Sequence, residues 1–385
     1  MPQNIVITSG GSAGHIYPAL TLYDELVNSY GRDINIIFIT SKDRLSQEIL
    51  RRFSGQFYAL PAGIKNEGLS LVGDIARFYP FKTVILIMNL IRGYFRSIKI
   101  IRRKKVSCCV AFGSVNAVAP FMAAATLKIP TIIHEQNIVL GRANKIMSLF
   151  ATKVALSFAE TTGLGRRPSA VTGNPIRSAA SKRIGREEAL ECLGLNKEKT
   201  TILVMGGSQG SVAVNSAVIK LIAQAERSFL SRIQLIHIAG QRDIERIGAF
   251  YKTSSITSKV LSFFEEMYII YSATDIAISR AGSSAIFELS HHAIASILIP
   301  YPYADAHQVK NAQFIASNGG CLLLEERGMA DGLLHSKLSE LVKNVSYRHE
   351  LGKRMAEISG GNSSERLAQE VIKILRSDGT RAQIS

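Results

Sequence analysis

The chain has 385 residues, of which 46% are hydrophobic and 20% are charged. A chain of this length and composition can bury two hydrophobic cores, which favours two folded domains and argues against intrinsic disorder. The formal net charge of +16 suits an anionic partner, which could be a nucleic acid, an anionic lipid surface or a polyanionic substrate.

The cysteines and the first residues indicate a reducing compartment. Cys108 and Cys109 are adjacent, Cys192 and Cys321 are isolated, and no CxxC spacing occurs, so a disulfide framework is not expected. Met1 is followed by neither the basic start nor the apolar stretch of a signal peptide. No apolar run reaches about 18 residues, the length of a membrane-spanning helix. We therefore expect a cytoplasmic protein that is soluble or bound at a membrane surface.

Predicted strands alternate with helical patterns in two series. This alternation is typical of parallel sheets covered by helices on both faces, so we predict two Rossmann-like α/β domains. The charged, loop-rich residues 173–189 connect the two series, and the domain boundary is expected near residues 175–177. A last helical pattern at residues 364–375 could pack on either domain. The predicted strands are residues 4–8, 34–40, 56–60, 108–112, 130–134 and 152–156, then 200–205, 233–238, 259–264, 275–279, 295–300 and 320–324.

Each series opens with a strand that ends in a Gly-Gly-Ser-x-Gly loop. The two copies are NIVITSGGSAGH at residues 4–15 and TILVMGGSQGSV at residues 201–212. Glycines let backbone N–H groups approach phosphate oxygens, and the helix start adds unpaired donors, so both loops are predicted to bind a diphosphate. This favours a nucleotide-sugar enzyme. NAD-dependent hydride transfer is disfavoured, because the first loop is not G-x-G-x-x-G and Asp43 follows Lys42 instead of closing the second strand.

His15 lies where the first loop becomes a helix. The positive end of the helix favours a neutral imidazole, the form that a general base needs near pH 7. His15 could therefore take a proton from an attacking hydroxyl, or it could be a helix-start histidine bonded to its neighbours. Ser12 could cap the helix, contact a phosphate or do both.

A basic and apolar segment follows at residues 72–105. Its apolar residues include 84–88 and then Phe95, Ile98 and Ile101 at helical spacing, as in an interfacial helix. The segment could meet lipid headgroups, or it could be a core crossover helix with a solvated basic end. Aromatic residues are too sparse for base stacking, so a nucleic-acid partner is disfavoured. Its cations are Arg77, Lys82, Arg92, Arg96, Lys99, Arg102, Arg103, Lys104 and Lys105, against the single acid Asp74.

Polar residues also follow later strands. His134, Glu135, Gln136 and Asn137 come at the carboxyl end of a strand, the edge where open α/β sheets bind ligands. They could equally form a loop whose polar groups satisfy one another. The eight histidines include no i, i+4 pair and no Asp-x-Asp ends a strand, so no tightly bound metal is predicted.

In the second series, SRAGSSAIFE at residues 279–288 forms another junction of strand, loop and helix. Glu288 within that helix could accept hydrogen bonds from both ribose hydroxyls, or it could be an exposed acid. The segment at residues 299–312 brings Asp305, His307, Gln308 and Asn311 after a strand, where they could bind sugar hydroxyls.

The motifs GGSAGH, HEQN, GNPIR, GGSQGS, SFFEEM, SRAGSSAIFE and DAHQVKNA follow one another in the order of the bacterial MurG family, which the chain resembles over nearly its whole length. MurG-like enzymes are inverting glycosyltransferases of GT-B architecture, with two Rossmann-like domains whose parallel sheets face each other across a deep cleft. They transfer N-acetylglucosamine from UDP-N-acetylglucosamine to the muramyl 4-hydroxyl of lipid I, and so form lipid II for peptidoglycan. The resemblance implies no cofactor and no metal.

The resemblance also implies a division of labour along the chain. Residues 1–176 would bind the acceptor and the membrane, residues 177–360 would bind the UDP-sugar, and residues 361–385 would form a helix that packs back on the N-terminal domain. The enzyme would lie peripherally at the cytoplasmic face of the plasma (inner) membrane. Its partners would be UDP-N-acetylglucosamine, lipid I, the anionic membrane surface, and cell-wall synthesis and division proteins.

Individual roles follow from the same resemblance, with His15 as the candidate general base. In the N-terminal half, the acceptor diphosphate would lie on Gly11, Ser12, Ala13, Gly14 and Gly113, the last being the one clear match in FGSVNAVAP to a loop that the family writes as Gly-Gly-Tyr. In the C-terminal half, Ser208 and Gln209 would contact the UDP phosphates, Phe264 the uracil and Glu288 the ribose. Other donor-site residues would be Arg280, Gly282, Ser283, Ser284, His307 and Gln308, with Asn137 and Arg177 lining the cleft.

Two other functions fit the same residues. A UDP-N-acetylglucosamine 2-epimerase of the same architecture would need neither a lipid nor the basic apolar segment. A nucleotide-sugar-binding scaffold at the division machinery would need no catalytic base.

Overall fold

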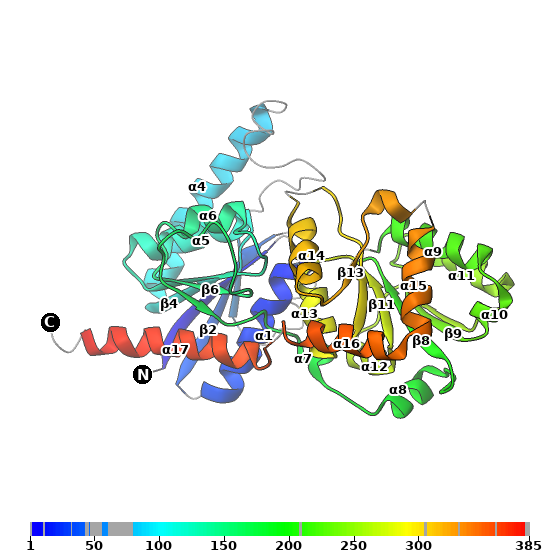
Figure 1. Cartoon of the computed structure of the whole chain (residues 1–385). Coiled ribbons are helices and arrows are strands. Elements are labelled where there is room, and N and C mark those ends of the chain that lie inside the picture. The colour runs from blue at the N-terminus through cyan, green and yellow to red at the C-terminus, as the bar shows by residue number, and fades with distance from the viewer. Residues whose placement is uncertain are drawn as a thin grey trace. The chain divides into compact units, whose positions relative to one another are not determined.

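The chain folds into two compact units in a computed structural model (Figure 1). Unit 1 comprises Met1–Arg177 and Asn362–Ser385, and unit 2 comprises Ser178–Gly361. The structure describes residues 2–10, 12–31, 33–42, 46, 56–60, 80–207, 210–303, 306–329, 332–358 and 360–381.

In its described part, unit 1 contains a sheet of seven parallel strands in the order β3-β2-β1-β4-β5-β6-β7. β1 lies between β2 and β4, so the strand order reverses direction there. In open α/β sheets the ligand crevice lies outside the carboxyl ends of the strands at such a switch point. The strands are β1 (Gln3–Thr8), β2 (Ile34–Ser41), β3 (Gln56–Leu60), β4 (Val106–Ala111), β5 (Thr131–Glu135), β6 (Lys153–Leu156) and β7 (Ser169–Val171).

Helices cover both faces of this sheet. Ile5 and Ile7 face a core that α1 and α17 complete, whereas Val6 between them faces a core with α4 and α5. This alternation is expected of a strand that is buried on both sides. α17 packs on α1 (Figure 1), so the last helix of the chain completes the core of unit 1. The helices are α1 (Ala13–Tyr30), α4 (Pro80–Arg103), α5 (Val115–Thr126), α6 (Arg142–Met147) and α17 (Ser363–Arg381).

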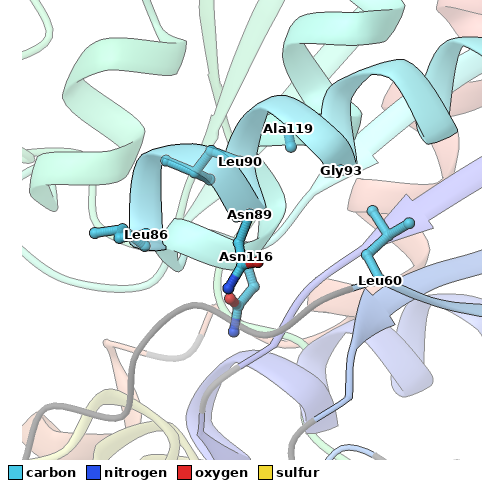
Figure 2. A pocket seen from close by; sticks show the side chains of 7 residues that line it. All are labelled: Leu60, Leu86, Asn89, Leu90, Gly93, Asn116 and Ala119. Atoms are coloured by element: carbon cyan, nitrogen blue, oxygen red, sulfur yellow. The ribbon is translucent and has the colours of Figure 1, made fainter. Parts of the chain in front are cut away.

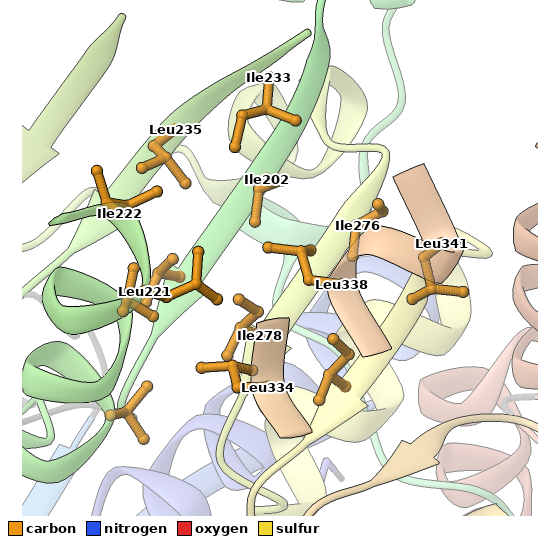
Figure 3. Packing of buried hydrophobic residues seen from close by; sticks show 14 of the residues in the cluster. Ile202, Leu221, Ile222, Ile233, Leu235, Ile276, Ile278, Leu334, Leu338 and Leu341 are labelled. Atoms are coloured by element: carbon orange, nitrogen blue, oxygen red, sulfur yellow. The ribbon is translucent and has the colours of Figure 1, made fainter. Parts of the chain in front are cut away.

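The described part of unit 2 contains a sheet of six parallel strands in the order β10-β9-β8-β11-β12-β13. Figure 3 shows how α15 covers one face: Leu334, Leu338 and Leu341 recur at helical spacing and point at the isoleucines of β8 and β11. The strands are β8 (Thr200–Met205), β9 (Ile233–Ile238), β10 (Ser258–Leu261), β11 (Ile276–Ser279), β12 (Ala295–Leu298) and β13 (Leu322–Leu323).

The helices of unit 2 connect these strands and flank the sheet. They are α7 (Ser178–Ser181), α8 (Arg186–Leu193), α9 (Val212–Gln224), α10 (Arg227–Leu230), α11 (Ile244–Thr253), α12 (Met267–Ala273), α13 (Ser283–His291), α14 (His307–Ser317), a 3₁₀ turn (Glu326–Met329), α15 (Leu333–Lys343) and α16 (Val345–Ala356). Among all described residues of the chain, no helix has both the length and the apolar character needed to cross a membrane.

The predicted α/β class and the two parallel sheets are confirmed, with differences at the sheet edges. β13 has two residues where five were predicted. β7 was not predicted, because this three-residue edge strand includes a half-exposed Val171 and has too short a hydrophobic pattern.

We expect Leu367→Ala to lower the free energy of unfolding of unit 1 by about 2–5 kcal/mol, because the change leaves a cavity in a packed core. Leu367 is 0% exposed in the core that α17 shares with β1. Calorimetry measures the effect, and Gln369→Ala on the exposed face of the same helix is the matched control. Equal and small effects of the two variants would contradict a core role for α17.

Candidate active site

The first glycine-rich loop joins β1 to α1 at the carboxyl edge of the sheet of unit 1. Ser12 is extended (φ −150°, ψ 157°) before the first helical residue, Ala13, but its hydroxyl makes no capping bond. Its Oγ bonds instead to Nδ1 of His15 at 2.7 Å. When Nδ1–H donates to the serine, Nε2 is unprotonated, as a general base requires. Gly14 lies in the first turn of α1, and Gly11 lies outside the described residues.

Gly113, which follows β4, gives the imidazole of His15 its space. Its φ of +75° favours glycine, and a Cβ there would lie 3.1 Å from Cδ2 and 3.2 Å from Nε2 of His15. Ser114 caps α5 by accepting a hydrogen bond from the backbone N–H of Asn116, whose side chain donates to Ser41 Oγ at 3.0 Å. The ends of β1, β2 and β4 therefore meet around His15.

The HEQN segment ends β5 with a buried carboxylate. Glu135 is 1% exposed and accepts hydrogen bonds from the backbone N–H groups of Asn137 and Gly141 at 2.9 and 2.8 Å. It also accepts from the side-chain amides of Asn137 and Asn144 at 3.0 and 2.8 Å. Four N–H donors offset the cost of burying the carboxylate. Glu135 thereby fixes the loop that carries Asn137 and the start of α6.

His134 and Gln136, at the same carboxyl edge of the sheet, form hydrogen bonds with other protein groups. His134 Nε2 lies 3.0 Å from the carbonyl oxygen of Gly173, and Gln136 Nε2 lies 3.2 Å from that of Phe112 and 3.3 Å from His134 Nδ1. Burial lowers the pKa of His134 to about 4, although the bond to Gly173 acts in the opposite direction. These two side chains therefore support the loop by mutual hydrogen bonding.

Asn144, in the first turn of α6, is a candidate site residue that the sequence analysis missed. It is 2% exposed, and its Nδ2 lies 3.5 Å from the position of a Cβ at Gly113. Its Oδ1 has no hydrogen-bond partner within the described residues. A buried acceptor of this kind marks a place where an incoming hydroxyl would gain a hydrogen bond. The surrounding sequence, RANKIM, reads as an ordinary helix and carries no signal of this role.

The GNPIR motif lies at the end of the first part of unit 1. Asn174 is 1% exposed, and neither Oδ1 nor Nδ2 has a partner within the described residues. The guanidinium of Arg177 lies 5.0 Å from the ring centroid of Tyr17 on α1. Arg177 is therefore held beside the first turns of the helix that carries His15.

In unit 2, the second glycine-rich loop joins β8 to α9. Gly210 (φ +77°) packs so closely on the next strand end that a Cβ would lie 2.2 Å from the carbonyl oxygen of Ala239. That carbonyl accepts a hydrogen bond from Asn215 Nδ2 at 2.9 Å, and Asn215 Oδ1 lies 3.1 Å from His237 Nε2. The buried hydrogen bonds of Asn215 thus support the second glycine-rich loop. Ser208 and Gln209, the predicted phosphate contacts, lie outside the described residues.

Arg280 connects the second glycine-rich loop to segments that follow other strands of the unit 2 sheet. It is 6% exposed, and its Nη2 donates to Oγ of Ser211, the N-cap of α9, at 2.8 Å. Its Nη1 donates to the carbonyl oxygens of Ile299 and Pro300 at 3.2 Å and pairs with Glu326 at 2.7 Å. Arg280 therefore braces three segments of the site through protein contacts.

The start of α13 offers donors and a carboxylate. Gly282 precedes the helix in an extended conformation. The backbone N–H groups of the first turn, including those of Ser283 and Ser284, are directed toward the N-terminal end of the helix. Ser284 Oγ is buried without a partner within the described residues. Glu288 is 9% exposed and accepts a hydrogen bond from the hydroxyl of Tyr271 at 2.6 Å. The alternative of an exposed helical acid was therefore wrong.

The remaining predicted donor residues follow β10 and β12. Gln308 Oε1 accepts a hydrogen bond from the backbone N–H of Tyr301 at 3.0 Å, and His307 Nδ1 is buried without a partner within the described residues. Phe264 follows β10, two strands from β8 in the sheet, and Asp305 lies outside the described residues. In the part of the chain that the structure describes, no three acidic, histidine or cysteine side chains gather as a metal site would need.

Two protein-family models match the chain. The glycosyltransferase family 28 N-terminal domain matches residues 5–156, and the C-terminal domain of the same family matches residues 201–371. The chain is 34% identical to the UDP-N-acetylglucosamine–N-acetylmuramyl-(pentapeptide) pyrophosphoryl-undecaprenol N-acetylglucosamine transferase of Protochlamydia amoebophila, over 87% of both chains. It is 31% identical to the enzyme of that name from Halothermothrix orenii, over 96% of this chain and 100% of the relative.

The fold is similar to a solved structure. The crystal structure of Acinetobacter baumannii MurG matches with a TM-score of 0.75 and 23% identity, over 97% of this chain and 100% of that one. This similarity supports the assignment of both sheets to the GT-B architecture.

We expect the protein to lose stability as the pH falls from about 6.5 toward 4. Burial lowers the pKa of His134, His237 and His292 from 6.5 to about 4, so the unfolded chain takes up protons in this range that the folded protein does not. Their contribution is complete above pH 6.5 and declines below it, by up to about 1.4 kcal/mol per pH unit for each histidine.

Thermal unfolding at a series of pH values between 7 and 4.5 measures this effect. His237→Gln should reduce the pH dependence of unit 2, whereas the same change at His349, which is exposed on α16, should not alter it. A thermal midpoint that stays constant over this range would contradict the prediction.

Proposed function

The chain belongs to the MurG family of UDP-N-acetylglucosamine–N-acetylmuramyl-(pentapeptide) pyrophosphoryl-undecaprenol N-acetylglucosamine transferases, and we propose that its two units divide the reaction between acceptor and donor. It is a glycosyltransferase that uses UDP-N-acetylglucosamine and converts lipid I to lipid II in peptidoglycan synthesis. Membership of this transferase family argues against the two alternative functions, a UDP-N-acetylglucosamine 2-epimerase and a non-catalytic scaffold.

We assign donor binding to unit 2. The UDP phosphates would lie against Ser208, Gln209 and the start of α13, where backbone N–H groups and the positive helix end stabilise negative charge. Glu288 would accept hydrogen bonds from the ribose hydroxyls. Its burial at the carboxyl edge of the sheet supports this role, because a buried carboxylate held by a hydrogen bond is already oriented for a ligand.

The outer parts of the donor would meet residues from other strand ends. Phe264 would lie beside the uracil, and His307 and Gln308 would contact the hexose. Nδ1 of His307 is buried and has no hydrogen-bond partner among the described residues, which supports a polar ligand at the start of α14. Arg280 would act on the phosphates through Ser211, since its hydrogen bonds go to Ser211 and to the segments behind it.

We assign acceptor binding to unit 1, with the lipid I diphosphate on the loop from Gly11 to Gly14 and beside Gly113. The observation that carries the catalytic proposal is the arrangement of Ser12, His15 and Gly113. Ser12 bonds to Nδ1 of His15, and Gly113 has no Cβ, which would otherwise lie 3.2 Å from Nε2. Asn137 and Arg177, although they belong to unit 1, would contact the donor.

In the proposed reaction, the muramyl 4-hydroxyl attacks the anomeric carbon of N-acetylglucosamine while Nε2 of His15 takes the hydroxyl proton. The new carbon–oxygen bond forms as the bond to the β-phosphate oxygen breaks, so the configuration at that carbon inverts. The negative charge that develops on UDP is stabilised by preorganised N–H donors of unit 2. No step uses a metal or a cofactor.

We further propose that α4 binds the anionic membrane surface at its cytoplasmic face. Leu86, Gly93, Ser97 and Ile101 face unit 1 and are buried. Figure 2 shows this inner side, where α4 and α5 leave a pocket of only about 10 Å³, too small for a ligand. The opposite side is apolar and exposed by 42–64%: Val84, Ile85, Ile87, Met88, Ile91 and Phe95.

The charges on α4 favour a lipid surface over water. Arg92, Arg96, Lys99, Arg102 and Arg103 are exposed along the same helix, and α4 contains no acidic residue. An apolar face flanked by cations is the pattern of a helix that lies in an anionic interface. In Figure 1 the first turns of α4 extend away from the rest of unit 1. Arg77 and the side chain of Lys82 lie outside the described part of the chain. Cell-wall synthesis and division proteins remain predicted partners.

We expect His15→Ala to lower the rate of sugar transfer about 10²-fold or more, because the attacking hydroxyl loses its base. Gly113→Ala should have a similar effect, since its Cβ would occupy the space beside Nε2. The assay follows radiolabelled sugar from UDP-N-acetylglucosamine to a lipid I analogue, with UDP-N-acetylgalactosamine as the donor control and His349→Ala as the variant control. Full activity of His15→Ala would refute this base, and a new UDP-sugar formed from the donor alone would indicate an epimerase.

We expect Phe95→Ser to weaken binding to vesicles that contain anionic phospholipid by about tenfold, because it removes one large apolar side chain from the interface. Binding should also weaken as salt increases. Vesicle sedimentation measures both effects. Val345→Ser, a change at a similarly exposed valine of unit 2 (48% exposed), is the matched control, and equal losses in the two variants would argue against a specific role of α4.

A further inference from the structure

Tyr271 is the hydrogen-bond donor to Glu288, the predicted ribose-binding residue. It is 2% exposed on α12, and its hydroxyl donates to Oε2 of Glu288 on α13 at 2.6 Å. The hydroxyl also lies 3.9 Å from the sulfur of Met205, the last residue of β8. A phenol has one proton to donate, and the shorter bond to the carboxylate is the stronger, so the proton goes to Glu288.

The ring of Tyr271 is itself held in place. Its centroid lies 5.2 Å from that of His292, with the ring planes inclined by 35°. His292 Nε2 in turn lies 2.7 Å from the carbonyl oxygen of Ala180 on α7. A ring that is buried and held in this way keeps its rotamer, and its hydroxyl keeps a fixed position under the carboxylate.

We propose that Tyr271 is a positioning residue for donor recognition, which orients the carboxylate of Glu288 toward the ribose of the UDP-sugar. This inference rests on the proposed role of Glu288. An ionised carboxylate offers about four acceptor positions, and the bond from Tyr271 uses one of them. A glutamate side chain loses considerable rotamer entropy when it binds a ligand. Because the hydrogen bond from Tyr271 already restricts Glu288, less of this entropy is lost when the donor binds.

The reaction itself does not involve Tyr271. The residue should therefore affect donor binding more than the chemical step, and its effect should depend on the ribose hydroxyls. A residue that merely stabilised unit 2 would alter the binding of every nucleotide equally. Discrimination between UDP and 2′,3′-dideoxy-UDP separates these two roles.

We expect Tyr271→Phe, which keeps the ring and removes the hydroxyl, to raise the Kd for UDP and the KM for UDP-N-acetylglucosamine about tenfold. The kcat at saturating donor should change less than twofold. The ratio of the Kd values for 2′,3′-dideoxy-UDP and UDP should fall toward one. Tyr268→Phe is the matched control, because Tyr268 lies on the same helix and its hydroxyl donates to Glu266 instead.

Isothermal titration of the full-length protein gives both Kd values, and their ratio does not depend on the folded fraction of a variant. A reduced ratio in Tyr271→Phe, with an unchanged ratio in Tyr268→Phe, supports the inference. A ratio of the natural size in Tyr271→Phe but not in Glu288→Ala overturns the role of Tyr271 and leaves that of Glu288 intact. A natural ratio in Glu288→Ala overturns both.

Discussion

Neighbouring strands are parallel throughout the described parts of both sheets, and this constraint decides where the candidate site lies. Parallel strands need crossover connections, so the carboxyl ends of one sheet share an edge and each is followed by a loop. In unit 1 this edge gathers His15, Gly113 and the HEQN segment. In unit 2 it gathers the second glycine-rich loop and the segments joined by Arg280. The direction of the strands therefore places groups that are far apart in the sequence beside one another.

Buried charges hold these edges in shape. Glu135 joins the end of β5 to the start of α6 through four N–H donors, and Arg280 joins the ends of β8, β11 and β12. A buried charge with its full set of partners contributes little net stability, but removing one partner is costly. Its value here is geometric, because each charge fixes loops from several strands at once. Loops that are fixed before binding lose less conformational entropy when the substrate arrives.

Much of the fold could be predicted from the sequence because the local signals agree with the final structure. Buried strands rich in β-branched residues, each followed by glycines and a helical pattern, indicated the two parallel sheets. The individual contacts could not be predicted in the same way. Ser12 suits an N-cap, yet its hydroxyl bonds to His15. Tyr271 reads as an apolar core residue, and only the folded arrangement of unit 2 brings its hydroxyl on α12 to Glu288 on α13. Such roles depend on which distant neighbours a side chain meets.

The unpartnered polar atoms show where the fold accepts a cost in stability. Within the described residues, the buried side-chain atoms without a hydrogen-bond partner belong to Thr8, Asn144, Ser157, Asn174, Ser284 and His307. Thr8 ends β1, and Ser157 and Asn174 lie in the loops after β6 and β7. The other three residues lie in the first turns of the helices that follow β5, β11 and β12, namely Asn144 in α6, Ser284 in α13 and His307 in α14. An unpaired buried polar group costs about 1–3 kcal/mol. Selection for stability alone would distribute such groups without regard to strand direction. Their restriction to the carboxyl edges of both sheets fits an enzyme whose polar groups are completed by the sugar, phosphate and hydroxyl groups of its substrates.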